Sequence, residues 1–129
     1  MFSIPPELAR LALDAAPDAM IIIDGSGRVC YANRQVSALF GYAHEEVIGA
    51  GVEQLMPERF RARHVAHREH YGAAARMRPM GAGLELLGRR SDGSEFPVEI
   101  SLSPIQDGDR ILVAAAIRDV SDRKQAEAE

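Results

Sequence analysis

Apolar and polar residues alternate most regularly in the last third of the chain. In residues 96–102 every second position is a large apolar residue, which predicts a strand that buries one face. Residues 111–117 are apolar on both faces, so a central strand of a sheet is expected there. A further strand is predicted over residues 84–90. The stretches 91–93 and 106–109 are polar and contain glycine, so they predict turns.

The first third carries another pair of strands and a short helix. Residues 19–23 are rich in β-branched side chains and predict a strand buried on both faces. Residues 24–27 predict a tight turn in which both glycines take a positive φ, and residues 28–32 predict the returning strand of a hairpin. Asn33 is the predicted N-cap of a short helix that ends at Gly41.

The middle of the chain predicts helices. Short ones are expected at residues 44–48 and 52–56 and a longer one at residues 58–75, followed by a loop over residues 76–83. At about 100° per residue, one face of the long helix carries two histidines and two aromatic residues: Phe60, His64, His67 and Tyr71. Such histidines can act as ligands or switches, or can hydrogen-bond to the backbone at the edge of the core, and both interpretations stay open.

Both ends of the chain predict helices outside this arrangement. Ser3 is the expected N-cap of a first helix, whose narrow apolar stripe consists of Leu8, Leu11 and Ala15. Residues 121–129 are polar and helix-favouring, with Ser121 or Asp122 as the N-cap. This last segment indicates the start of a connector to another part of the protein.

The predicted order of elements is β-β-α-α-α-α-β-β-β. It corresponds to an α+β fold in which a five-stranded antiparallel sheet carries short helices on one face. A chain of 129 residues suits one domain with a substantial core. We therefore expect an N-terminal flanking helix at residues 1–16, one domain at residues 17–120, and the start of a connector helix at residues 121–129.

Composition excludes several classes of function. The net charge of -4, with no strongly basic region, argues against nucleic-acid binding. The apolar runs at residues 19–23 and 111–117 are too short to cross a membrane, and the N-terminus has no secretory signal, so a cytoplasmic protein is expected. Cys30 is the single cysteine, which rules out an internal disulfide, and its place in a strand predicts an inert buried thiol.

The residues give no sign of catalysis by this domain. No Ser/His/Asp order, phosphate loop or carboxylate pair emerges, and Gly81-Ala82-Gly83 lacks the strand before it and the helix after it that a nucleotide loop needs. His64 and His67 could share a metal ion, but two ligands fall short of the three or four that zinc usually takes. We expect a regulatory module that is not an enzyme and holds no separate metal site.

Short motifs spread over nearly the whole chain carry a family resemblance. They are Asp24-Gly25, Tyr31-Ala32-Asn33, Phe40-Gly41-Tyr42, Glu46-Val47-Ile48-Gly49, Leu55-Met56-Pro57, Arg90-Ser91-Asp92-Gly93, Phe96-Pro97-Val98-Glu99 and the run from Ile117 to Lys124. Each motif is loose by itself, but their order is specific. With these motifs the chain resembles a PAS sensory domain.

The resemblance implies a sensor for a small ligand, a redox state or a partner. A PAS domain passes its signal through the last strand to a C-terminal helix, which leads to a histidine kinase, a diguanylate cyclase, a phosphatase or another PAS domain. Here Asp119 would hold that junction by capping or by pairing with a basic group, together with Ser121 and Asp122. The expected pocket-lining residues are His64, His67, His70, Tyr71, Leu84, Leu86, Val113, Ala115 and Ile117.

Within the family, residues 61–64 resemble the haem-binding PAS domains of oxygen-sensing histidine kinases. That resemblance implies His64 as the axial ligand of a haem iron. His70 and Leu84 stand where those sensors carry a basic residue and an oxygen-contacting arginine. A flavin photosensor is not expected, because its reactive cysteine motif is absent. Haem sensing, binding of another ligand, and dimerisation without a ligand all remain open.

The first helix and the last strand also predict self-association. The helix has an apolar stripe too narrow to bury it, and the outer face of residues 111–117 carries small apolar side chains. Two chains could cover these surfaces together, with the first helix lying across its own sheet or on that of the partner. We expect a homodimer, joined in the parent protein to a downstream effector domain.

Overall fold

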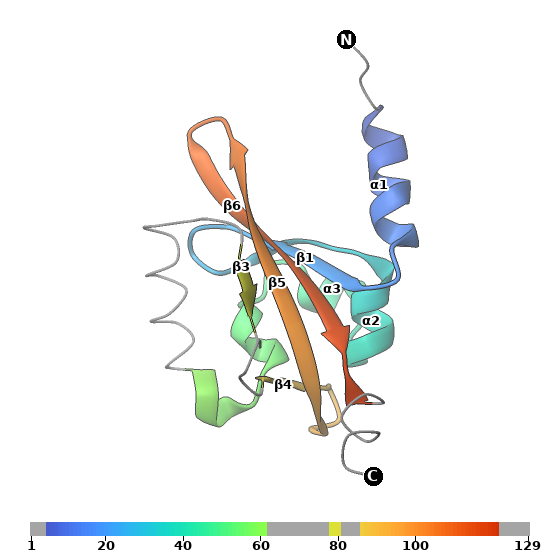
Figure 1. The fold of residues 1–129 in the computed structure, drawn as a ribbon, viewed down its shortest axis with the longest axis vertical. Coiled ribbons are helices and arrows are strands. Elements are labelled where there is room, and N and C mark those ends of the chain that lie inside the picture. Colours follow the sequence, from blue (N-terminus) through green and yellow to red (C-terminus); the bar gives the residue numbers. More distant parts are fainter. Residues whose placement is uncertain (1–4, 62–77, 81–85, 122–129) are drawn as a thin grey trace.

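The computed structural model describes residues 5–61, 78–80 and 86–121. They form one antiparallel sheet in the strand order β2-β1-β6-β5-β3, with short helices packed on one of its faces (Figure 1). In chain order the elements are α1 (Pro6–Ala15), β1 (Ala19–Ile23), β2 (Val29–Ala32), α2 (Arg34–Phe40), α3 (His44–Val47), η1 (Val52–Leu55), η2 (Glu58–Phe60), β3 (Arg78–Met80), β4 (Leu86–Arg89), β5 (Glu95–Asp107) and β6 (Arg110–Asp119).

The sheet has the expected five positions across, but its last position is split. β4 pairs with β5 from Glu95 to Val98, and β3 pairs with the next part of the same edge, from Ile100 to Leu102. The predicted loop over residues 76–83 is therefore wrong at β3, which is a strand. The reason is the length of β5, because its 13 residues extend beyond β4 and leave an edge that can accept a second short strand.

The central position predicted for residues 111–117 is confirmed. β6 lies between β1 and β5 and is antiparallel to both. β1 was expected to be buried on both faces, but only Ala19, Ile21 and Ile23 are buried, whereas Met20 and Ile22 on the opposite face are half-buried. The cause is that the short helices pack on the inner face of the sheet, where the core lies.

Two phenylalanines join the helical layer to the sheet. The ring of Phe40 at the end of α2 packs against the ring of Phe96 in β5, with centroids 5.4 Å apart and planes tilted by 59°. Gly88 of β4 passes directly over this pair, and a Cβ added there would lie 2.9 Å from Phe96 and 3.2 Å from Phe40. Glycine is required at this position by the close approach of the rings.

The turn between β1 and β2 uses one of its two glycines in the expected way. Gly27 has a φ of 84°, but Gly25 does not take a positive φ. Instead the Asp24 carboxylate accepts hydrogen bonds from the Ser26 amide, the Ser26 hydroxyl and the Arg28 amide. The hydrogen bond from the Ser26 hydroxyl is the main reason that the pKa of Asp24 is lowered. Gly41, with a φ of 82°, ends α2 as predicted.

The first helix stands away from the sheet (Figure 1). α1 begins after Pro5 rather than at a Ser3 cap, and Ser3 lies outside the described residues. None of its side chains is buried, so α1 does not lie across the sheet of its own chain. None of the helices in the described ranges has both the length and the apolar character needed to cross a bilayer.

Candidate sensory and signalling site

The predicted ligand-binding histidines fall outside the described part of the chain. This holds for His64, His67, His70, Tyr71 and Leu84, and also for Asp122 at the start of the predicted connector. The long helix expected over residues 58–75 is described only at its start, as η2 and Arg61. These residues stay predictions, and the site is built below from the others.

The remaining pocket candidates lie together on the inner face of the sheet. Val113, Ala115 and Ile117 of β6 are buried members of the core, with exposed fractions of 9%, 5% and 5%. Leu86 of β4 is half-buried and packs against the same core. They are apolar side chains of the inner face, three of them on the central strand and Leu86 on the edge strand β4.

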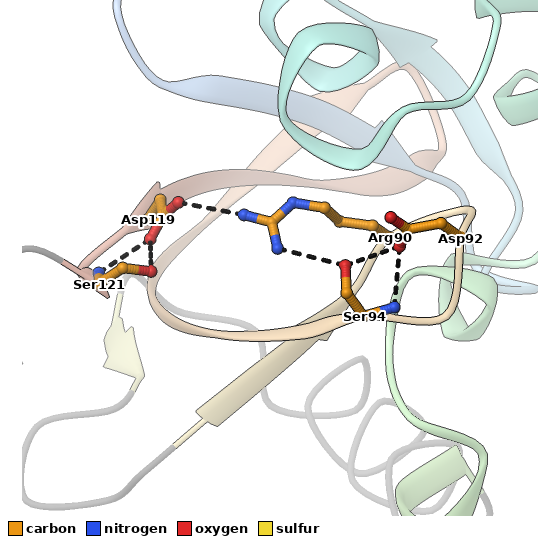
Figure 2. A network of polar contacts seen from close by, with 5 residues as sticks. All are labelled: Arg90, Asp92, Ser94, Asp119 and Ser121. Carbon is orange, nitrogen blue, oxygen red and sulfur yellow. Dashed lines mark hydrogen bonds and ion pairs between the residues drawn. The ribbon is translucent and has the colours of Figure 1, made fainter.

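At the end of β6, the side chain of Asp119 binds in two directions (Figure 2). Its Oδ1 accepts hydrogen bonds from the amide and from the hydroxyl of Ser121, with 2.8 Å from the amide nitrogen. Its Oδ2 lies 3.5 Å from Nη2 of Arg90. Capping and pairing with a basic group were the alternatives for Asp119, and the described contacts are the ion pair with Arg90 and the hydrogen bonds from Ser121. Ser121, one of the two expected N-caps, here donates its amide to the Asp119 carboxylate.

Arg90 connects this strand end to the aromatic pair in the core. Its guanidinium carbon lies 4.0 Å from the centroid of the Phe96 ring, a cation–π contact. Its Nη1 is 3.5 Å from the hydroxyl oxygen of Ser94 (Figure 2). The side chain of Arg90 thus contacts the end of the last strand directly, and it is linked to the helical layer through Phe96, which packs on Phe40.

The turn that carries Arg90 is held by its own hydrogen bonds. The Asp92 carboxylate accepts from the Ser94 amide at 2.8 Å and from its hydroxyl at 2.6 Å, and these bonds lower the pKa of Asp92. The Ser91 amide donates to the Phe40 carbonyl, and the Ser91 hydroxyl donates to that of Gly41. The turn between β4 and β5 is thus bound to the end of α2, and this places Arg90 beside the helical layer.

Asn33 has a role that the sequence did not predict. The helix begins after it, as expected, but its side chain makes no capping hydrogen bond. Fully buried, it accepts from the Met20 amide at 2.9 Å and donates to the carbonyls of Leu13 and Asp18 at 2.8 and 3.0 Å. The three groups lie in the last turn of α1, in the connecting segment and in β1, so Asn33 fixes that connection from both sides. Local spacing carries no signal for these distant partners.

A half-open groove of about 580 Å³ lies where α1 meets β2, α2 and α3. Its lining residues are Arg10, Asp14, Cys30, Tyr31, Ala32, Arg34, Ser37, His44 and Ile48. The expectation of a buried Cys30 is wrong, because this thiol is exposed. Ile22 pairs with Tyr31 and Ile23 with Val29, so Cys30 is the extra residue of a bulge and is left outside the pairing.

Across the parts of the chain that the structure describes, no three His, Cys, Asp or Glu side chains come together as a metal site. The sequence analysis identified the motif Arg90-Ser91-Asp92-Gly93, so Arg90 was available as a candidate for the basic partner of Asp119. The pairing itself required the register of the sheet, in which Asp119 lies opposite Val98 in β5.

Comparison with known proteins agrees with this fold. Residues 17–122 match the PAS domain family. Sensor protein FixL of Bradyrhizobium diazoefficiens is 34% identical over 119 residues, which are 92% of this chain and 24% of FixL. Oxygen sensor protein DosP of Escherichia coli is 28% identical over 110 residues, 85% of this chain and 14% of DosP. The chain therefore spans a quarter or less of these curated relatives.

Solved structures show the same architecture. The PAS domain of an HTR-like protein from Haloarcula marismortui superposes with a TM-score of 0.74 at 25% identity, covering 88% of this chain and 89% of that one. An RNA-binding Light-Oxygen-Voltage receptor superposes with a TM-score of 0.80 at 24% identity. The superposition covers 98% of this chain and 38% of the receptor chain. The second likeness concerns the fold alone. By its family match and by its identity to sensor proteins, the chain belongs to the PAS domain family and has the PAS fold.

Proposed function

We propose that this PAS domain is a sensory module of a larger signal-transduction protein, such as a histidine kinase. It binds a small ligand or a partner on the inner face of the sheet and transmits a shift through β6 to a C-terminal connector helix. The observation that carries the proposal is the pair of contacts at Asp119, which joins Arg90 to Ser121. Relatives described as a sensor protein and as a cell-division control histidine kinase support it.

The central strand is well suited to transmission. β6 pairs with two strands, and its inner residues Val113, Ala115 and Ile117 belong to the core. The next residue after the strand, Val120, is buried, and its amide donates to the Pro97 carbonyl at 3.1 Å. A displacement beneath the sheet therefore reaches the strand end without being absorbed by a loop. On this proposal residues 17–120 are the sensor, and residues 121–129 begin the connector.

Replacement of Asp119 by asparagine tests the transmission step. We expect the effector activity of the full-length protein to lose most of its response to the signal. The isolated domain should lose only about 1 kcal/mol of stability, because the side chains of Arg90 and Asp119 are 33% and 31% exposed and water screens the pair. In this domain the amide of Ser121 should exchange about fivefold faster with solvent, as its acceptor is weakened. Effector assays and hydrogen exchange measured by NMR are the readouts.

The matched control is Asp109→Asn, which removes a carboxylate at the turn between β5 and β6, at the other end of the last strand. It should leave both the response and the exchange of Ser121 unchanged. A full-length Asp119→Asn protein that responds like the wild type would contradict the proposed route.

Haem binding is the second candidate. The resemblance of residues 61–64 to haem-binding PAS domains favours it, as does the similarity to a protein described as an oxygen sensor. The inner face offers an apolar wall formed by Leu86, Val113, Ala115 and Ile117, and such a wall suits the faces of a porphyrin. A bound haem would supply an iron that takes a diatomic gas, with His64 as its axial ligand.

Titration with haemin separates this candidate from other ligands. If it is right, the purified chain develops a Soret band at one equivalent, and His64→Ala loses most of that band. His44→Ala is the matched control, because His44 is exposed at the start of α3. A chain that gives no band, or a band that persists in His64→Ala, rules out the haem assignment and leaves the transmission proposal intact.

We further propose that the domain acts as a homodimer that uses the apolar face of α1. Leu8 and Leu11 on this helix are 53% and 58% exposed. A neighbouring side of α1 carries Arg10 and Asp14, which line the groove against β2. A helix that turns its polar residues toward its own domain leaves its apolar residues for another surface. Dimerisation without any ligand is the simplest function that this surface alone would support.

A further inference from the structure

A bidentate ion pair joins η2 to the first residue of β5. Nη1 of Arg59 lies 2.7 Å from Oε2 of Glu95, and Nη2 of Arg59 lies 2.8 Å from Oε1. The two residues are 36 positions apart in the chain. Two parallel N–H···O bonds fix direction as well as distance, so the orientation of η2 is tied to that of Glu95.

Glu95 directly follows the turn that carries Arg90. It pairs with Arg89 across the two strands, and the Arg90 amide donates to the Ser94 carbonyl at 2.8 Å. A shift of Glu95 therefore moves the base of the Arg90 side chain. Arg59 of η2 binds Glu95 directly after the turn between β4 and β5, and Arg90 within that turn reaches Asp119 at the end of β6.

The chain before η2 is anchored separately in the core. Leu55 is 5% exposed and Pro57 is fully buried, so η2 begins from a fixed point. The Nε of Arg61 donates to the Met56 carbonyl at 3.2 Å, which closes the segment onto itself. A movement of η2 is then a rotation about Pro57. The ion pair of Arg59 with Glu95 transmits this rotation to the edge of the sheet.

We propose that the Arg59–Glu95 pair couples η2 to the output junction, with the β4–β5 turn as the connecting element. Arg59 and Glu95 act as positioning residues: they act through Arg90 on Asp119 and need not touch a ligand. This inference rests on the proposed role of Asp119, and it adds a second route beside the one through β6. A signal that displaces η2 reaches the connector even when the inner face of the sheet does not move.

The exposure of the pair suits this role. The side chains of Arg59 and Glu95 are 55% and 34% exposed, and exposed ion pairs add little to folding stability. The pair can therefore break and re-form without unfolding the domain. The hydrogen bond from Arg59 is also the main reason that the pKa of Glu95 is lowered.

NMR on the whole 129-residue chain without any ligand tests the coupling. The variants are Arg59→Gln, Glu95→Gln, the double variant, and the exchanged pair Arg59→Glu with Glu95→Arg. Each single variant should speed amide exchange of Ser121 at least threefold. The double variant should add nothing further, and the exchanged pair should restore most of the protection. Arg28→Gln is the matched control, because Arg28 donates to the Gly49 carbonyl, away from the β4–β5 turn.

The melting temperature of each variant should remain within about 2 °C of the wild type, which separates coupling from unfolding. If the single variants alter only the amides near residue 59 and leave Ser121 unchanged, the inference is overturned. If the single variants change the amide exchange of Ser121 but the full-length Asp119→Asn protein still responds to the signal, the coupling stands and the proposed role of Asp119 fails. The two ideas can therefore be rejected independently.

Discussion

Replacement of Asn33 by alanine should destabilise the domain by about 3 kcal/mol, the largest stability effect that we expect from a polar substitution. The change leaves the Met20 amide and the carbonyls of Leu13 and Asp18 without their side-chain partner. Burial makes that loss costly, because water cannot easily take the place of the amide. Urea unfolding followed by circular dichroism gives the free energy of unfolding.

Asn33→Asp gives a sharper test of the same contacts. A carboxylate can still accept from the Met20 amide, but it faces two carbonyl oxygens that previously received hydrogen bonds. The protonated acid is favoured in the folded state, so the pKa of this aspartic acid should be higher folded than unfolded. Stability relative to the wild type should then be best below the unfolded pKa of about 4 and should fall as the pH rises.

The matched substitution is Asn33→Ser, which keeps a small polar group and helix-capping ability but cannot span the three partners. If capping were the role of Asn33, serine would be nearly neutral. We expect it to cost almost as much as alanine. A serine variant with wild-type stability would contradict the role assigned to this side chain.

Replacement of Leu11 by glutamate should weaken self-association by one to two orders of magnitude. Burying a leucine side chain contributes about 1.5–3 kcal/mol, and a carboxylate in the same contact adds a desolvation cost. The argument depends on how α1 is fixed, since the Asp14 carboxylate accepts from the Tyr31 hydroxyl at 3.4 Å and from the Arg34 amide at 3.2 Å. Arg10 and Asp14 thus face their own domain, and Leu8 and Leu11 face outward.

We assign this surface to α1 of a second copy, because one apolar stripe can meet its symmetry mate about a twofold axis. Sedimentation velocity at micromolar concentration should give a dimer for the wild type and mainly monomer for Leu11→Glu. Glu7→Gln, on the same exposed helix, should remain dimeric. A wild-type chain that sediments only as a monomer would refute the dimer.

The edge of the sheet illustrates a limit of local reasoning. Alternation of apolar residues was enough to predict most of β5 and all but the ends of β6 as strands, and five sheet positions followed from the order of elements. The strand at Arg78–Met80 was missed, because a proline-containing stretch of three residues has no periodicity of its own. It pairs with β5 only because that strand extends beyond β4.

By itself the sequence determined the order of the described elements apart from β3, the inward face of β5 and β6, the end of α2 at Gly41 and membership of the PAS family. These features depend on side-chain periodicity, backbone preference and short motifs, which are local. Only the tertiary structure decided the partners of Asn33, the exposure of Cys30, the ion pair of Arg59 with Glu95 and the contact of Arg90 with Asp119. Each of these depends on the register and packing of segments far apart in the chain, which no local pattern encodes.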